Sequence, residues 1–241
     1  MSGVSNGIVY YSDCRGDEAI LSAARAQLAH ACNGHQIVSS CLGYVPLGTI
    51  RINHAKAERS YETMFKQILA GLELLDADVA FLAEHDVLYH PSHLEFVPPK
   101  RDVIYYNVNV WKVDAETGRA LHYDCQQTSG LVAYRDTLLA HYRKRCEMVA
   151  AHGFSRKMGF EPGTHRRAER VDDLTSESFK SALPNVDIRH GHNLTQSRWK
   201  REQFRNQRYT KGWTEADEVP GWGVTKGRFA EFLKEAVYGD H

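Results

Sequence analysis

The chain has 241 residues with 30 basic and 30 acidic side chains, so its net charge is zero at neutral pH. Hydrophobic residues make up 42% and charged residues 25% of the chain, which are the proportions of a globular domain and exclude a disordered protein. The sequence has no run of roughly 20 apolar residues and begins with polar residues, so we expect neither a membrane span nor a signal peptide.

The N-terminal part of the chain alternates between strand and helix patterns. Short apolar, β-branched runs predict buried strands over 7–13, 36–42 and 79–83. Apolar residues at helical spacing predict helices over 17–31 and 56–75. This alternation predicts an α/β fold with a mostly parallel central sheet that is flanked by helices.

Strand patterns dominate the sequence after Pro98 and Pro99. The patterns predict strands over 103–111, 120–123, 129–135 and 185–190, a turn over 114–118, and helices over 136–149 and 228–237. The tail from 194 to 223 is rich in Arg, Gln and Trp. Because no repeat or low-complexity linker interrupts the chain, we expect a single domain with a C-terminal elaboration.

The five cysteines indicate the compartment. They are widely spaced, odd in number and include no Cys-x-x-Cys pair. This pattern favours reduced thiols in the cytoplasm over a disulfide framework or a cysteine-ligated zinc ion.

An apolar strand leads directly into two acidic residues, Glu84 and Asp86, which flank His85. In open α/β sheets, ligands bind beyond the carboxyl ends of the strands. Two carboxylates in a partly dry site need a counter-charge, and a divalent cation with oxygen ligands, magnesium or manganese, supplies one. The alternative for Asp86 is a helix cap or a surface turn.

The order of these motifs resembles that of nucleotide-sugar-dependent glycosyltransferases of the GT-A fold. The first strand ends near Asp13, and a later strand ends in an Asp-x-Asp-type motif, here Glu84-His85-Asp86 with Glu in the first position. The segment 129–135 resembles the Gly-Gly-x-x-x-aromatic-Arg strand of family-2-like members. The resemblance spans 8–192 and extends to small glycosyltransferase-like proteins of phages and bacteria.

This resemblance implies an enzyme that uses a nucleoside diphosphate sugar together with Mn²⁺ or Mg²⁺. Asp86 is its firmer metal ligand and Glu84 its less certain one, and His190 matches the C-terminal histidine that many members add. Glu161 stands where inverting members carry the catalytic base, although the usual Glu-Asp pair is absent. The expected reaction is therefore inverting transfer.

The resemblance also implies a donor site. Asp13 would lie where the nucleoside binds, Tyr11 would stack or hydrogen-bond beside it, Arg51 would pair with a phosphate, and His85 lies within the motif. The alternatives are a strand-end turn for the first two residues and a plain surface position for Arg51. The expected organisation is a nucleotide-binding half, an acceptor and catalytic half, and the C-terminal elaboration, at 1–97, 98–193 and 194–241.

Two other classes of function are open. His85, His90 and His93 suggest a metal-dependent hydrolase, but Pro91 interrupts them and Glu84 is misplaced for a His-Glu-x-x-His helix. A non-catalytic protein that binds nucleotide sugars is the other alternative. A dehydrogenase is disfavoured because no Gly-x-Gly-x-x-Gly follows the first strand.

Charge is unevenly distributed along the chain. Residues 134–211 contain 17 Lys and Arg against 9 Asp and Glu, a net +8, and the rest of the chain carries −8. This basic segment includes two clusters of basic and aromatic residues, at 198–201 and 204–209, which either grip phosphates or pack on the domain with their charges in water. The candidate acceptors are DNA with a hydroxylated base, a glycan, or a small molecule.

Overall fold

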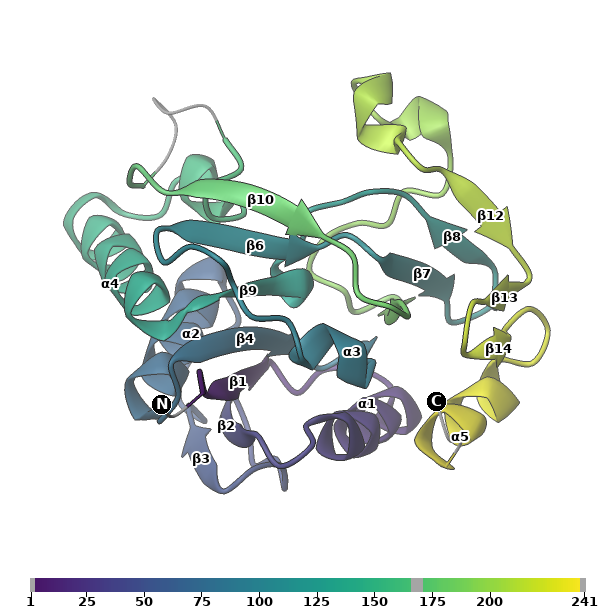
Figure 1. Ribbon diagram of the computed structural model, residues 1–241, viewed down its shortest axis with the longest axis horizontal. Helices are drawn as coiled ribbons and strands as arrows, with labels where there is room; N and C mark the ends of the chain where they lie inside the picture. Colours follow the sequence, from purple (N-terminus) through teal and green to yellow (C-terminus); the bar gives the residue numbers. More distant parts are fainter. Residues whose placement is uncertain (1–2, 166–170, 239–241) are drawn as a thin grey trace.

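Seven strands form the largest sheet of the computed structural model, which describes residues 3–165 and 171–238 (Figure 1). The strands are β1 (Asn6–Ser12), β2 (Gln36–Cys41), β3 (Ile50–Asn53), β4 (Val79–Glu84), β6 (Val103–Asn107), β9 (Leu131–Tyr134) and β10 (Thr175–Phe179). Their order is β10-β6-β9-β4-β1-β2-β3, and only β9 runs antiparallel to its neighbours. The predicted α/β fold with a mostly parallel central sheet is therefore confirmed.

Five α-helices accompany the sheets in the part of the chain that the structure describes. They are α1 (Glu18–Ala31), α2 (Tyr61–Leu74), α3 (Pro91–Leu94), α4 (Arg135–His152) and α5 (Phe229–Tyr238). Asp17 caps α1 by accepting from the Ala19 amide, and Ser60 caps α2 by accepting from the Thr63 amide. The second helix was predicted to begin at 56 but begins only after its Ser60 cap.

Alternating side chains of β1 enter two different cores. Val9 packs in the cluster that contains residues of α2 and α4, and Ile8 packs in the cluster that contains Leu28 of α1. Both side chains are fully buried. The sheet is therefore covered on both faces, which explains the continuous apolar character of its central strands.

Close packing of α2 against β1 depends on Gly71, because a Cβ there would overlap Val9 Cγ1. We expect Gly71→Ala to lower the free energy of unfolding by about 1–3 kcal/mol, since the helix must move away from the sheet. Urea denaturation measures this change. A Val9→Ala, Gly71→Ala double variant should lose less stability than the sum of both single variants, because Val9→Ala removes the overlapping methyl group. Strictly additive losses would contradict this packing.

A second sheet, not foreseen from the sequence, contains five strands in the order β12-β8-β7-β11-β5. They are β5 (Val87–Leu88), β7 (Val110–Asp114), β8 (Ala120–His122), β11 (Asn185–Arg189) and β12 (Thr214–Ala216). A short hairpin of β13 (Glu218–Val219) and β14 (Gly223–Val224) follows.

The single strand predicted over 103–111 is wrong, because that segment belongs to two sheets. The side chain of Asn107 accepts hydrogen bonds from the amides of Asn109 and Ser181, at 3.0 and 3.2 Å. These bonds redirect the chain between β6 and β7. The sequence analysis also missed β3 and β10, which have half-buried or exposed residues along their length.

The tail packs on the domain through aromatic side chains. It contains two 3₁₀ turns, at Arg201–Gln203 and Gln207–Thr210. Phe204 is buried against Tyr123 and Trp213. Among the described residues, no helix is both long and apolar enough to cross a bilayer.

Candidate functional site

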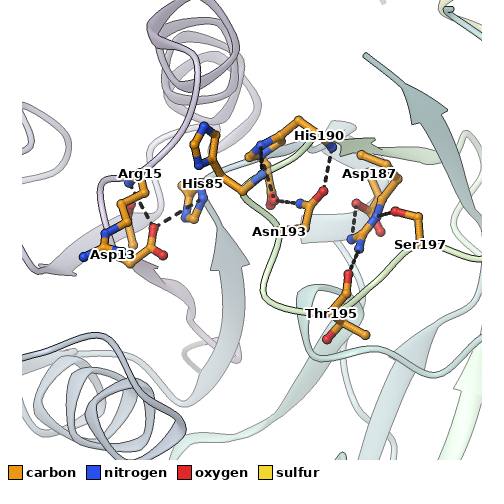
Figure 2. Close-up of polar contacts among 12 residues, drawn as sticks. Asp13, Arg15, His85, Asp187, His190, Asn193, Thr195 and Ser197 are labelled. Atoms are coloured by element: carbon orange, nitrogen blue, oxygen red, sulfur yellow. Dashed lines mark hydrogen bonds and ion pairs between the residues drawn. The ribbon is translucent and has the colours of Figure 1, made fainter. Parts of the chain in front are cut away.

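Three strand ends bring Asp13, His85 and His190, three of the predicted site residues, to one region of the molecule (Figure 2). β1 and β4 are parallel neighbours with Tyr11 opposite Glu84, so Asp13 and Asp86 both follow the same edge of the sheet. β11 pairs with β5, which comes directly after Asp86, and the Ile188 amide donates to the Asp86 carbonyl at 2.9 Å. This pairing places His190, just beyond β11, beside Asp86.

His85, Asp86 and His190 form a candidate metal centre. Each offers one ligand atom, and these atoms lie within 4.8 Å of one another. The side chain of Asn193 makes both contacts: its Nδ2 donates to Asp86 Oδ2 at 2.5 Å, and its Oδ1 accepts from the His190 backbone amide at 2.6 Å. Asn193 therefore fixes the relative positions of Asp86 and His190.

The ionisation and hydrogen bonding of this group suit a cation. Burial raises the pKa of Asp86, but His190, His85 and Arg189 together bring the pKa below its ordinary value. His190 Nε2 is buried 3.5 Å from Asp86 Oδ2 and makes no hydrogen bond with any described residue. An ionised carboxylate close to an imidazole nitrogen that makes no hydrogen bond is a suitable pair of ligands for a divalent ion.

Glu84 lies outside this group of three. Its Oε1 accepts a 2.5 Å hydrogen bond from the Tyr11 hydroxyl, and burial, followed by the charge of Asp86, raises its pKa to about 8. The Tyr11 hydrogen bond opposes this increase in pKa, because it stabilises the ionised carboxyl. Tyr11 is only 5% exposed, so it supports Glu84 and offers no open ring face to a ligand.

Asp13 has three polar neighbours, of which Arg59 is the cation. Its Oδ2 forms a 2.5 Å ion pair with Arg59, its Oδ1 accepts from the Arg15 amide at 3.0 Å, and His85 Nε2 lies 3.7 Å from Oδ1. Arg59 also donates to the His192 carbonyl at 2.7 Å and so ties the first strand to the segment after β11. The sequence analysis missed Arg59, and no pattern around it distinguishes it from other arginines.

Arg51 does not join the site residues. It is exposed on β3, where its side chain donates to the Gly48 carbonyl and the Tyr44 hydroxyl, both at 3.2 Å. Among the described residues, its hydrogen bonds involve none of the other predicted donor-binding side chains. Arg59 is the arginine that the fold places there.

Glu161 follows a 3₁₀ turn and is half-buried. Burial raises its pKa, an effect that its own backbone amide and Arg145 oppose. The Ser176 hydroxyl lies 3.3 Å from the Gly163 carbonyl, two residues after Glu161, and 3.4 Å from Gln126 Oε1. The turn after Glu161 therefore borders Gln126, whose neighbour Gln127 bonds to Asp187, but Glu161 itself forms no ion pair or hydrogen bond with His85, Asp86 or His190.

A buried polar network borders this region and was also missed. Lys112 Nζ donates to Gln127 Oε1 at 3.0 Å, and Gln127 Nε2 donates to Asp187 Oδ2 at 3.1 Å. Arg189 pairs with Asp187 Oδ1 at 3.2 Å and donates to Ser197 Oγ at 2.9 Å (Figure 2). In-register pairing of Asp187 with Lys112 puts both side chains on one face of the second sheet.

No protein-family model and no curated protein matches the sequence. The geometry must therefore carry the functional argument. It combines a two-histidine, one-carboxylate group with a neighbouring carboxylate–arginine pair and a half-buried glutamate whose pKa is raised. Such a site can bind a divalent ion with an anionic ligand and can accept a proton.

Cys14, beside Asp13, has the properties of a reactive thiol. It is exposed with φ of 58°, and a hydrogen bond from Cys41 lowers its pKa to about 6 although burial opposes this shift. Because the thiolate is the nucleophile, we expect iodoacetamide to modify Cys14 with a rate that is half-maximal near pH 6 and level above pH 7. Mass spectrometry locates the adduct.

The matched control for this prediction is Cys14→Ser, which should abolish the fast modification. Cys41 is buried and its pKa is raised, so it should stay unmodified in both proteins. A rate that increases only above pH 8, as for an ordinary thiol, would contradict the assignment.

Proposed function

We propose that this chain is a metal-dependent glycosyltransferase of the GT-A type, which moves a sugar from a nucleoside diphosphate to a hydroxyl acceptor. The observation that carries the proposal is the His85, Asp86 and His190 group at the carboxyl end of β4, beside Asp13 and Arg59. The mostly parallel sheet and the order of the motifs along it support the same proposal.

The ligand atoms indicate which metal is preferred. Two imidazole nitrogens and one carboxylate suit a transition metal, whereas Mg²⁺ prefers oxygen ligands and retains several waters. We therefore expect Mn²⁺ to bind more tightly than Mg²⁺. A bound ion would neutralise the charge on the diphosphate that leaves, acting as a Lewis acid.

Each site residue then has a defined task. Asp86 and His190 hold the ion with His85, and Asn193 orients the first two. Asp13, held by Arg59, faces the nucleoside side of the donor.

Glu161 accepts the proton of the acceptor hydroxyl. The hydroxyl oxygen bonds to the anomeric carbon as the bond from that carbon to the diphosphate oxygen breaks. This single displacement releases a nucleoside diphosphate and inverts the anomeric configuration.

A metal-dependent hydrolase is the second candidate, because two histidines and a carboxylate also form catalytic zinc sites. The two proposals differ in what they require. A hydrolase needs Zn²⁺ and water alone, whereas a transferase responds to nucleoside diphosphates only in the presence of its metal. A non-catalytic binding protein would also respond to nucleoside diphosphates in the presence of the metal, but it would transfer no sugar.

A thermal-shift screen tests the proposal. Nucleoside diphosphates and their sugars are added with Mn²⁺, Mg²⁺ or Zn²⁺, and the melting temperature is compared with that for each component alone. We expect stabilisation that requires both a diphosphate ligand and Mn²⁺. Stabilisation by Zn²⁺ alone, with no response to any nucleotide, would favour the hydrolase.

A further inference from the structure

The segment 198–211 carries a dense set of exposed positive charges. Its six exposed basic residues are Arg198, Lys200, Arg201, Arg205, Arg208 and Lys211, and its one acidic residue is Glu202. Within residues 3–165 and 171–238, none of the six forms an ion pair, although ion pairs occur elsewhere on this part of the surface. An unneutralised block of cations attracts an anionic partner.

This segment is anchored to the domain and is not a loose tail. The Gln203 side chain accepts from the amides of Trp199 and Lys200, at 2.7 and 2.9 Å. Lys211 accepts from the Asp124 amide at 2.8 Å, and Phe204 is buried against Tyr123 with ring centroids 5.1 Å apart. The cations are therefore presented from a defined backbone.

Three of the arginines stack on aromatic rings. The guanidinium groups of Arg198, Arg201 and Arg208 lie 5.1, 5.7 and 4.9 Å from the ring centroids of Phe204, Trp213 and Tyr209 respectively. Stacking occupies the flat face of a guanidinium group and leaves N–H groups at its edge for phosphate oxygens. Tyr209 is itself 50% exposed and offers a ring on which a base can stack.

One end of this cationic segment adjoins the candidate site. Arg198 lies over the ring of Phe204, which packs in one cluster with Cys125. The next residue, Gln126, has its Oε1 atom 3.4 Å from Ser176 Oγ, which lies 3.3 Å from the Gly163 carbonyl, two residues after Glu161. Arg189 donates to the Ser197 hydroxyl and thereby holds the residue next to Arg198 (Figure 2). An extended anion on the segment 198–211 would thus reach the neighbourhood of the proposed base.

We propose that residues 198–211 form a docking surface for nucleic acid, which presents an acceptor group to Glu161. The role of the nucleic acid as acceptor rests on the proposed transferase function, but the binding itself does not. Arginine edges beside an exposed aromatic ring match phosphates alternating with bases better than they match an anionic glycan, which has no base to stack. A base in a duplex would have to leave the stack to reach Glu161.

Fluorescence anisotropy tests the docking surface. The probes are a labelled DNA strand of about 20 nucleotides and its duplex, titrated with the full chain over a salt series. We expect affinity to fall steeply as salt increases. Arg205→Ala, Lys211→Ala should weaken binding about tenfold and lower the salt slope by about two, since neither side chain makes a hydrogen bond with a described residue.

The matched control is Lys66→Ala, Lys144→Ala, which removes the same charge from exposed positions of α2 and α4. We expect it to bind DNA as the parent does. Absence of binding at low salt, a flat salt response, or equal losses in both variants would overturn the proposal. Binding of heparin without binding of DNA would also overturn it, in favour of a glycan partner.

The thermal shift with nucleoside diphosphate and Mn²⁺ keeps the two proposals distinguishable. The double variant at Arg205 and Lys211 should retain this shift in full. DNA binding without a thermal shift from any nucleotide would contradict the transferase proposal and support the docking surface. A thermal shift from nucleoside diphosphate and Mn²⁺ without DNA binding would contradict only the docking surface.

Discussion

Asp86→Ala is expected to abolish nucleotide binding that depends on Mn²⁺, with a loss of affinity of at least about 100-fold. Asp86 is the only carboxylate in the group with His85 and His190, and its pKa is lowered, so it is ionised at neutral pH. Its removal leaves a cation with two neutral ligands. Even residues that only support a metal ligand typically contribute 10–100-fold, so a ligand should contribute no less. Isothermal titration with Mn²⁺ and nucleoside diphosphate measures the change.

Two further variants separate metal binding from folding. Asp86→Asn keeps the size of the side chain, so a melting temperature near that of the parent together with lost Mn²⁺ dependence would show a ligand role. Asp102→Ala removes an exposed carboxylate and should change neither quantity. His190→Ala should weaken the metal more modestly than Asp86→Ala, because an imidazole brings no charge. Parent-like Mn²⁺ binding in both Asp86 variants would show that the metal assignment is wrong.

Glu161→Gln is expected to retain donor affinity and to lower the turnover of sugar transfer by about 10²–10⁴-fold, because glutamine cannot accept the acceptor proton. Burial raises the pKa of Glu161 above its ordinary value of 4.5. The base acts when it is ionised, so activity should fall as pH decreases through this raised pKa. The acid limb of the profile should therefore lie at a higher pH than an exposed glutamate would give.

The control for this prediction is Glu147→Gln, an exposed position on α4. It should retain both turnover and the acid limb. Unchanged turnover in Glu161→Gln would place the base elsewhere. Asp172 and Asp124 are less suited to the task, because His141 engages the first at 2.6 Å and Lys180 the second at 2.9 Å.

The central strands could be predicted from sequence because burial on both faces leaves an apolar run that stands out. The same signal failed at 103–111, where one continuous run covers the end of β6 and the start of β7. The break there depends on hydrogen bonds between Asn107 and Ser181, which is remote in sequence: the Ser181 amide donates to Asn107 Oδ1, and Asn107 Nδ2 donates to Ser181 Oγ. Patterns of hydrophobicity contain no information about such a contact.

The candidate site likewise contains features that the sequence predicts and features that depend on tertiary contacts. The motif at Glu84-His85-Asp86 was visible because its residues follow a buried strand, and the structure brings His190 to it. The ion pair of Asp13 with Arg59 was not visible, because it forms only when α2 packs beside β1. Likewise, Asn193 contacts Asp86 only through the pairing of β11 with β5.

The pairing of β11 with β5 joins two segments that are far apart along the chain. Asp86 lies just after β4 of the seven-stranded sheet, and His190 lies directly after β11 of the five-stranded sheet. A ligand bound by both residues would link the two sheets. Occupancy should therefore slow hydrogen exchange at the Ile188 amide, which donates to the Asp86 carbonyl, more than in the interior of either sheet. Local unfolding of one sheet would then be coupled to local unfolding of the other, and the bound ligand would contribute to the cooperativity of unfolding.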